Sequence, residues 1–510
     1  MAKRIDITSR RALLAGLAAG VATSVSAQQA SLIAPRTSIR PLPRGEEGVV
    51  RERPAPPPLA DLASVVEGAG LSGQFSCVVM DAHTGEVLEA YQPALSLPPA
   101  SVAKSLTTLY ALDALGPGYR FKTRVLATGP TVNGVIQGDI VLAGGGDPTL
   151  ESDGLATLVD KLAQAGINGV TGRFILADAA LPSLRMIDKD QPDHVGYNPA
   201  ISGLNLNFNR VFFEWKRESA GYDITMEARS AGLRPPVSVA RMRVVDRKVP
   251  VYTYEDEGDR DGWTVAKGAL GKGGGRWLPV RNPSLYAGEV FLTLAKDKGI
   301  RLPEPETGAL PDDARILAER SSADLRRILK DMLKYSTNLT AETVGLAASR
   351  ARGLPVTSLR ESSAAMNLWL MQRYGVEDVA LVDHSGLGED SRVSSYAMAA
   401  GLAKAGFDGP LPELMKPVTP RDEEGKAVSN TRVRIQAKTG TLNFASALAG
   451  YISAPGEREL TFAIFSVNLE ERAKIPKEDR ERPDGSRAWN ARSRRLQRTL
   501  LTRWAKLPVN

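Results

Sequence analysis

A lysine stands three residues after a serine at only one place in the chain, Ser101-Val102-Ala103-Lys104. The residues from Val102 to Leu115 have helical periodicity and stop at Gly116-Pro117-Gly118, which predicts a helix that begins at Ser101. Serine is a favoured N-cap residue, and its hydroxyl would lie near the positive end of the helix dipole. One helical turn also brings the Lys104 amine within hydrogen-bond reach of that hydroxyl. Lysine acts as a base only where burial and a neighbouring cation lower its pKa, so the fold must enclose this pair.

A second pattern, Lys438-Thr439-Gly440-Thr441, contains the only K-T-G in the chain. It lies in a β-rich stretch, and two further strands of an antiparallel sheet are expected to follow it, at 445–453 and 460–467. A glycine inside a strand indicates close approach of another backbone or a ligand. We expect Lys438 to be the second cation. A substrate along this edge could pair with the main chain, and its acyl oxygen could accept from the N–H groups of Ser101 and Thr441.

A third pattern, Ser336-Thr337-Asn338, lies between two helical segments, 323–335 and 339–351. A loop between helices can project a hydroxyl and a carboxamide into a cleft. Ser466-Val467-Asn468 has the same S-x-N pattern, but it follows the K-T-G and ends an apolar strand. We interpret this second copy as structural.

Composition excludes several chemistries. Cys77 is the only cysteine among 510 residues, so the chain forms no intramolecular disulfide and no Cys-rich zinc site. Its apolar neighbours favour a buried strand position over a reactive thiol. The three histidines are far apart and show no metal-ligand spacing, so we expect neither a zinc peptidase nor any cofactor. The formal charge of +7 is partly carried by the first 27 residues and is otherwise spread out, which does not favour nucleic-acid binding.

The N-terminus has the features of an export signal. Ser9-Arg10-Arg11 precedes an apolar, Ala-rich stretch, and Val25-Ser26-Ala27 is a small-residue cleavage site. We therefore expect an exported, periplasmic protein whose mature chain begins at Gln28. The paired arginines resemble a twin-arginine signal, and an ordinary Sec signal is the alternative. Residues 28–58 are rich in Pro and Arg and predict an extended linker, and no later apolar run is long enough to span a bilayer.

Both ends of the folded part carry recognisable elements. Residues 75–80 and 86–91 are β-rich and flank the turn sequence at 81–85, which predicts a hairpin. Residues 487–505 alternate Arg with Leu and Trp at helical spacing. We expect this segment to be a closing helix packed on the sheet, with a membrane-surface helix as the alternative.

In the order S-x-x-K, S-x-N, K-T-G the three motifs resemble those of the penicillin-binding protein and serine β-lactamase superfamily. The 235 positions from Ser101 to Ser336 resemble the class C low-molecular-mass penicillin-binding proteins, the D-alanyl-D-alanine carboxypeptidase/endopeptidase family, which insert extra domains there. Residues 144–150, 282–289 and 383–387 agree with that family. His384 stands where the family usually has glycine, and residues 421–434 lack its glycine-rich pattern, so the rim of the cleft is expected to differ.

The resemblance implies an α/β (α+β) fold, in which a transpeptidase-like domain combines an antiparallel sheet with a helical cluster. That domain would be split into residues 59–125 and 310–510, around an insert at 126–309 of one or two mainly β domains. Strands are expected in the insert at 135–143 and 172–178. Its polar, glycine-rich part at about 215–277 would be a small β domain of its own or one long irregular excursion.

The resemblance also implies a serine D-Ala-D-Ala carboxypeptidase that acts on peptidoglycan stem peptides and is acylated by β-lactam antibiotics. A β-lactamase or esterase on the same fold and a non-catalytic peptidoglycan-binding scaffold are the alternatives, and the intact motifs argue against the scaffold. The implied roles fall to nine residues: Ser101 as nucleophile, Lys104 as base, Ser336 as proton relay, Asn338 as holder of the acyl amide, Lys438 as the cation that keeps Lys104 neutral, Thr439, Gly440 and Thr441 as the carboxylate-binding strand, and Asp178 as a contact for a diaminopimelate amine.

Overall fold

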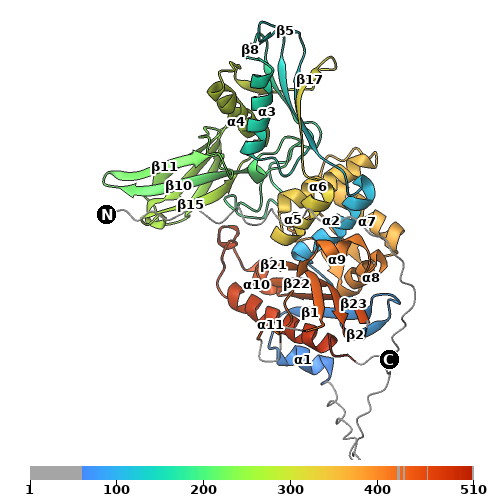
Figure 1. The fold of residues 1–510 in the computed structure, drawn as a ribbon. Helices are drawn as coiled ribbons and strands as arrows, with labels where there is room; N and C mark the ends of the chain where they lie inside the picture. The colour runs from blue at the N-terminus through green and yellow to red at the C-terminus, as the bar shows by residue number, and fades with distance from the viewer. Residues whose placement is uncertain (1–59, 422–425, 429–430, 457, 508–510) are drawn as a thin grey trace, which may run out of the picture. The chain divides into compact units, whose positions relative to one another are not determined.

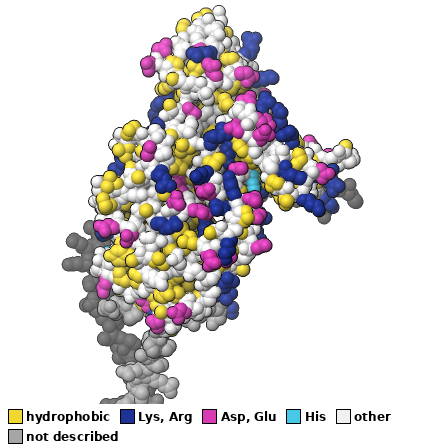
Figure 2. All heavy atoms as spheres, turned by 180° about the vertical axis from the view of Figure 1, so that it is seen from behind, with side chains coloured by type: hydrophobic (Ala, Val, Ile, Leu, Met, Phe, Trp, Pro, Cys, Tyr) yellow, Lys and Arg dark blue, Asp and Glu magenta, His cyan; other side chains and the backbone are white. Residues whose placement is uncertain are grey.

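The computed structural model describes residues 60–421, 426–428, 431–456 and 458–507, which belong to one unit by their contacts. The predicted export signal and the whole of the predicted linker lie outside these ranges. Within them, no helix is both long and apolar enough to cross a membrane. Basic and acidic side chains are interspersed over the face shown in Figure 2, so positive charge is spread there rather than gathered in one field.

The central sheet joins strands from the two ends of the chain, coloured blue and red in Figure 1. Its order is β2-β1-β23-β22-β21-β20, and every neighbouring pair is antiparallel. The predicted hairpin and the three predicted C-terminal strands are confirmed. The bounds are β1 Gln74–Asp81, β2 Val87–Tyr91, β20 Lys416–Pro417, β21 Arg434–Leu442, β22 Ala445–Ala454 and β23 Arg458–Val467. Nearly every residue of β22 and β23 is buried, because helices cover both faces of the sheet.

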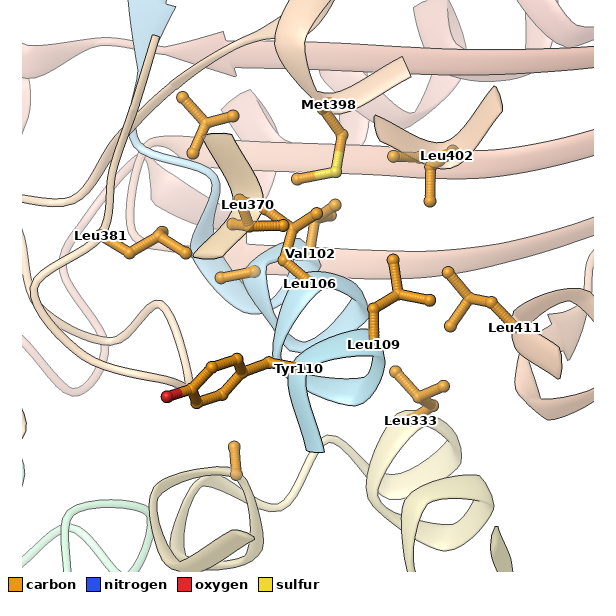
Figure 3. Packing of buried hydrophobic residues seen from close by; sticks show 14 of the residues in the cluster. Val102, Leu106, Leu109, Tyr110, Leu333, Leu370, Leu381, Met398, Leu402 and Leu411 are labelled. Carbon is orange, nitrogen blue, oxygen red and sulfur yellow. The ribbon is translucent and has the colours of Figure 1, made fainter. Parts of the chain in front are cut away.

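A cluster of helices covers one face. Its centre is α2 (Ala103–Leu115), in which every residue from Ala103 to Ala111 is buried. Leu106 and Leu109 of α2 pack with Met398 and Leu402 of α8, as Figure 3 shows. Each fully buried side chain of this size stabilises the fold by about 1.5–3 kcal/mol. The helices around α2 are α5 Leu325–Tyr335, α6 Asn338–Ala351, α7 Leu359–Tyr374, α8 Ser395–Ala405 and the short α9 Pro410–Leu414.

The last long helix, α11 (Ser486–Trp504), packs on the opposite face of the sheet together with α1 (Leu62–Gly68). The Trp504 ring lies 5.8 Å from that of Phe462 on β23. The apolar stripe of α11 is therefore occupied by the sheet, which confirms the expectation of a closing helix.

A second, mixed sheet is built by the middle of the chain, in the order β16-β9-β7-β4-β17. Its strands are β4 Lys122–Ala127, β7 Ile140–Gly144, β9 Phe174–Ala177, β16 Pro305–Thr307 and β17 Arg315–Ser321. Helices α3 (Ser152–Gln164) and α4 (Pro283–Asp297) share its hydrophobic core. Strands β4 and β17 pair with each other, so this sheet reaches beyond residues 126–309 on both sides.

The polar part of the insert consists of two three-stranded sheets, β11-β10-β15 and β12-β14-β13. Its strands are β10 Arg210–Glu218, β11 Gly221–Glu227, β12 Ala240–Val245, β13 Tyr252–Asp256, β14 Asp261–Ala266 and β15 Gly273–Pro279. The glycines of β15 leave room for aromatic rings of β10, because a Cβ at Gly275 would overlap the ring of Phe212. Trp263 of β14 is buried, so this part also contributes to the core of the insert.

The remaining elements are short. Two small sheets and four 3-10 turns connect the larger units, and α10 precedes α11. Their bounds are β3 Ser96–Leu97, β5 Thr131–Val132, β6 Val135–Ile136, β8 Gly169–Val170, β18 Val379–Ala380, β19 Arg392–Ser394, α10 Leu469–Ala473, η1 Ala100–Val102, η2 Asn207–Asn209, η3 Lys267–Ala269 and η4 Lys477–Asp479.

Candidate active site

Ser101 lies in the 3-10 turn η1, immediately before α2. Ser101 is not the N-cap of this helix, because α2 begins at Ala103 and its N-cap is Val102. Since the chain enters the helix through a tighter turn, the Ser101 hydroxyl is not used in capping and faces Lys104 instead.

Lys104 is completely buried and has three neighbours. Its Nζ lies 2.9 Å from Ser101 Oγ, 2.7 Å from Asn338 Oδ1 and 2.8 Å from the carbonyl oxygen of Ser385. Two of these atoms can only accept a hydrogen bond, and the Ser101 hydroxyl can also donate one. An uncharged amine fits this arrangement, because it would donate to the two carbonyl oxygens and accept from Ser101. Burial lowers the pKa of Lys104, while the nearby carboxylates of Glu342 and Asp383 oppose this effect.

The S-x-N motif links α5 to α6, as predicted. Ser336 ends α5 in the left-handed conformation (φ 60°), and Asn338 is the first residue of α6. Ser336 Oγ lies 2.9 Å from Lys438 Nζ. Asn338 donates from Nδ2 to the carbonyl oxygen of Tyr197, 2.9 Å away, so a residue of the insert contacts the motif directly.

Lys438 is almost fully buried on β21, where it also donates to the Thr439 carbonyl oxygen at 2.6 Å. Its pKa falls to about 6, first because of burial and then because of the charges of Lys104 and Lys416. The two lysines repel each other's protons, so both are protonated together only in acid.

Strand β21 runs directly past the nucleophile. A Cβ at Gly440 would lie 2.9 Å from the Pro99 carbonyl oxygen and 3.0 Å from the backbone nitrogen of Ser101, which confirms the predicted close approach. On its outer edge, β21 pairs with β20 only at Gln436 and Ala437. From Lys438 onward, that edge has no strand partner among the described residues, so an extended peptide could pair with it there. Thr439 and Thr441 are exposed.

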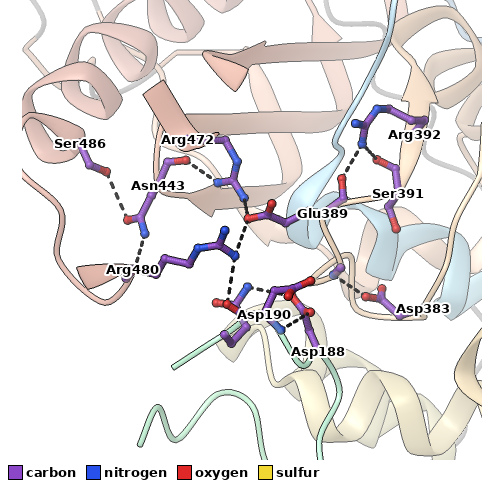
Figure 4. A network of polar contacts seen from close by, with 12 residues as sticks. Asp188, Asp190, Asp383, Glu389, Ser391, Arg392, Asn443, Arg472, Arg480 and Ser486 are labelled. Atoms are coloured by element: carbon purple, nitrogen blue, oxygen red, sulfur yellow. Dashed lines mark hydrogen bonds and ion pairs between the residues drawn. The ribbon is translucent and has the colours of Figure 1, made fainter. Parts of the chain in front are cut away.

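A cavity of about 400 Å³ connects Ser101, Ser336, Asn338 and Thr441. Its far wall comes from the chain between β23 and α11, and a polar network crosses it (Figure 4). In this network Glu389 lies 2.7 Å from Arg472 and 3.3 Å from Arg480, and Arg480 donates to the Asp190 carbonyl oxygen of the insert at 3.0 Å. The arginines are thus held by acidic and carbonyl groups at the edge of the cavity.

The sequence reasoning missed two buried acids beside Lys104. Glu342 follows Asn338 by four residues on α6, a spacing that puts both on one helix face and could have drawn attention to it. Asp383 lies in residues 383–387, which agree with the family but belong to none of the three motifs. Tyr197, Arg472, Arg480 and Glu389 were also missed, and no motif surrounds them.

Asp178 follows β9 in the insert and is held by hydroxyl groups. Its Oδ2 accepts from Ser284 Oγ at 2.5 Å and from Ser202 Oγ at 3.2 Å. It is not among the residues that line the cavity. The structure therefore brings together Ser101, Lys104, Ser336, Asn338, Lys438 and Thr441 but leaves Asp178 apart from them.

The unusual His384 does not alter the rim, because its side chain is completely buried. The ring lies 2.7 Å from Ser362 Oγ through Nε2 and stacks on Tyr110. A Cβ at Gly345 would overlap this ring, so a glycine on α6 supplies the space for the imidazole. Of residues 421–434, only part is described, and the expected difference there stays a prediction.

Other residues singled out by the sequence serve the fold. Ser466 Oγ lies 2.8 Å from Ser493 Oγ, and Asn468 caps α10, so the second S-x-N is structural. Cys77 is buried in β1, and burial raises the pKa of its thiol to about 12. His83 pairs with Glu459. In the described ranges, no three His, Cys, Asp or Glu side chains gather as a metal site.

Comparisons with known proteins agree with this geometry. Residues 59–485 match the model of the D-Ala-D-Ala carboxypeptidase 3 (S13) family. The chain is 28% identical over 454 residues to a D-alanyl-D-alanine carboxypeptidase of Actinomadura sp., covering 80% of both chains. It is 24% identical over 413 residues to a D-alanyl-D-alanine carboxypeptidase of Haemophilus influenzae, covering 76% of this chain and 84% of the relative.

A solved structure shows the same fold. The crystal structure of penicillin-binding protein 4 from Haemophilus influenzae superposes with a TM-score of 0.70 at 21% identity, covering 88% of this chain and all of that one. The family match spans most of the chain and includes all three motifs. The chain therefore belongs to the D-Ala-D-Ala carboxypeptidase 3 (S13) family and is a serine-type D-Ala-D-Ala carboxypeptidase with a penicillin-binding fold.

Proposed function

We propose that this enzyme hydrolyses the D-Ala-D-Ala ends of peptidoglycan stem peptides through an acyl-enzyme on Ser101. The observation that carries the proposal is the set of neighbours of Lys104 Nζ, two carbonyl acceptors and the Ser101 hydroxyl. A neutral amine in this set would donate to the two carbonyl oxygens and point its lone pair at the Ser101 proton to be removed.

Acylation follows from that arrangement. Ser101 Oγ gives its proton to Lys104 Nζ and attacks the carbonyl carbon of the scissile bond. The oxygen that becomes negative would accept from the N–H groups of Ser101 and Thr441. The C–N bond then breaks, and the leaving D-alanine nitrogen takes a proton through Ser336, which lies 2.9 Å from Lys438 Nζ. The competent state has Lys104 neutral.

Recognition would use the open edge of β21. The substrate backbone would extend along residues 438–442, with the acyl amide held by Asn338. The exposed hydroxyls of Thr439 and Thr441 would bind the terminal carboxylate, or the carboxylate of a β-lactam. Water then hydrolyses the ester and frees Ser101. Cleavage of cross-linked peptides is part of the same proposal, since it breaks the same kind of bond.

Location forms a further part of the proposal. Its support is the sequence of residues 1–27, which we infer directs export to the periplasm, where the wall lies. N-terminal sequencing of the mature protein should begin at Gln28. A mature chain that still begins at Met1 would contradict export by this signal.

Two measurements test the activity. Fluorescent penicillin should label the wild type covalently, and peptide mapping should place the label on Ser101. Purified muropeptides should lose one D-alanine, detected by mass analysis. Labelling that persists in Ser101→Ala, or muropeptides left intact by an enzyme that binds penicillin, would contradict the proposal.

A further inference from the structure

Two buried carboxylates lie beside the Ser101–Lys104 pair and take no part in the steps above. Glu342 on α6 is 0% exposed, and Asp383, before β19, is 2% exposed. A buried carboxylate is costly unless it is well hydrogen-bonded, and two that repel each other cost more. Their retention beside a reactive lysine therefore needs a physical reason.

Both carboxylates hold the same short turn. Glu342 accepts from the backbone N–H groups of His384 at 2.9 Å and Ser385 at 2.8 Å. Asp383 accepts from those of Gly386 at 2.5 Å and Gly388 at 2.6 Å. All four oxygens are thus used on residues 384–388.

This turn carries the atom that orients Lys104. The Ser385 carbonyl oxygen, between the two pairs of bonds, accepts from Lys104 Nζ at 2.8 Å. The next residue, Gly386, has a φ of 73°, and a Cβ there would overlap the carbonyl oxygen of Ala100. The turn therefore lies directly against the nucleophile turn and fixes the amine relative to Ser101.

The charges that face Lys104 come from three elements: Glu342 from α6, Asp383 from the turn and Lys438 from β21. His384 adds none, because burial lowers its pKa to about 3. Farther out, Lys416 acts on Lys438 and Asp188 acts on Asp383. Where they are ionised, the two carboxylates favour the charged form of Lys104, and burial opposes it. Burial first and the charge of Asp383 next raise the pKa of Glu342 to about 8, and burial also raises the pKa of Asp383.

We propose that Glu342 and Asp383 are positioning residues for acylation, which hold the Ser385 carbonyl against Lys104 and stabilise the ammonium that Lys104 becomes. The inference rests on the proposed function, since it assumes that Lys104 takes the Ser101 proton. That proton moves from Ser101 Oγ to Lys104 Nζ, and no bond to either carboxylate forms or breaks. The acids thus decide how strong a base Lys104 is.

The test is the pH dependence of penicillin acylation in Glu342→Gln and Asp383→Asn. Acylation needs neutral Lys104, so its rate falls on the acid side as Lys104 is protonated. Loss of one buried negative charge makes the ammonium less favourable. The acid limb should therefore move to lower pH by about one unit, while the plateau rate falls by up to about tenfold because the base is weaker. Glu342→Asp keeps the charge and should return the limb towards the wild-type position.

Asp147→Asn is the matched control, because Asp147 is an equally buried carboxylate that pairs with Arg320 in the insert. Asp147→Asn should leave the acid limb of the pH–rate profile at its wild-type position. Circular dichroism shows whether Glu342→Gln and Asp383→Asn fold. If either folded variant has an acylation rate that is reduced equally at every pH, the inference is overturned. A wild type that penicillin does not acylate would overturn the proposed function as well, whereas normal acylation with an unshifted limb would overturn only this inference.

Discussion

Two lysine side chains share one buried site in this enzyme, and burial penalises the charge of both. Only Lys104 has carboxylates as counterions. Lys438 has instead a hydroxyl, a carbonyl oxygen and the charge of its neighbour. Because the two amines interact, their protons leave in steps that belong to the pair. The two lysines should therefore respond differently to substitution.

Lys104→Ala should lower the rate of acylation by penicillin about 10²- to 10⁴-fold, the usual contribution of a positioned general base. The rate is measured with a fluorescent penicillin at neutral pH. Lys330→Ala, an exposed lysine of α5, is the control and should keep the wild-type rate. Near-normal acylation of Lys104→Ala would rule out its role as base.

Lys438→Ala should raise the KM for carboxylate-bearing substrates and change the pH profile of acylation. Lys438 Nζ lies 2.9 Å from Ser336 Oγ, and burial first and the charge of Lys104 next lower its pKa to about 6, so the variant removes a group that titrates below neutral pH. The KM and the pH profile are measured with a D-Ala-D-Ala peptide. A KM and a pH profile that both match the wild type would contradict this account.

For single residues, the spacing of the motifs predicted the reactive serine and lysine but not the side chains around them. The spacing of one helical turn predicted that Lys104 lies beside Ser101. The position of Gly440 inside a strand predicted the contact between β21 and the turn that carries Ser101. The exact helix start was missed, since a 3-10 turn depends on packing. Glu342 and Asp383 were missed because an acidic residue in a sequence is usually exposed, and only tertiary burial makes it a counterion.

Helix α6 shows how one element adapts to an unusual neighbour. Gly345→Ala should destabilise the protein by about 1–3 kcal/mol, because the added methyl group overlaps the His384 ring in a packed core. The free energy of unfolding is measured by denaturant titration. In Gly345→Ala/His384→Gly the loss should be smaller than the sum of the two single losses. Additive losses would show that the two positions do not share this space.

Asp178 stands at the end of β9, and its role stays a prediction. If it binds a diaminopimelate amine, Asp178→Asn should slow cleavage of peptides with that amine more than acylation by penicillin, which lacks it. Rates on the two substrates are compared in one preparation. Equal losses would show that Asp178, held by Ser284 and Ser202, only supports the insert.

Strands were predicted correctly where the apolar pattern was long. They were predicted incorrectly where contacts from distant residues interrupt the strand. β22 and β23 were located almost to the residue. The expected strand 135–143 is instead β6 and β7, separated at Gln137–Asp139. There the Gly138 carbonyl oxygen accepts from Gly172, and Asp139 binds Arg173. These contacts come from 30 or more positions away, so a local pattern could not reveal the break.

Across the whole molecule, the insert and the C-terminal segment meet at Glu481. Its carboxylate lies 2.9 Å from His194 Nε2 and 3.0 Å from the Arg276 guanidinium. These contacts, the hydrogen bond with His194 first, lower the pKa of Glu481 to about 2 against the opposing effect of burial. The ionised group therefore binds the two parts to each other.

Glu481→Gln should lower the Tm of the protein at neutral pH. Because the folded pKa lies below the unfolded value of about 4.3, the stabilisation is present above that value and is lost as pH falls towards 2. The difference in Tm between the variant and the wild type should thus narrow in this window. Glu478→Gln, an exposed glutamate of the same segment, should show no such difference. A Tm gap that is constant with pH would contradict the ionic origin.

The pairing of β1 with β23 also makes the active site depend on the last part of the chain to be synthesised. Gln74 has Val467 as its partner, so the strand that precedes the nucleophile waits for almost the entire chain to be synthesised. The middle sheet, from β4 to β17, can close well before that, since all its strands lie between residues 122 and 321. Pairing across so many residues is slow and comes late. Chains that end before β21 to β23 therefore have no K-T-G edge and lack the strands against which α2 packs.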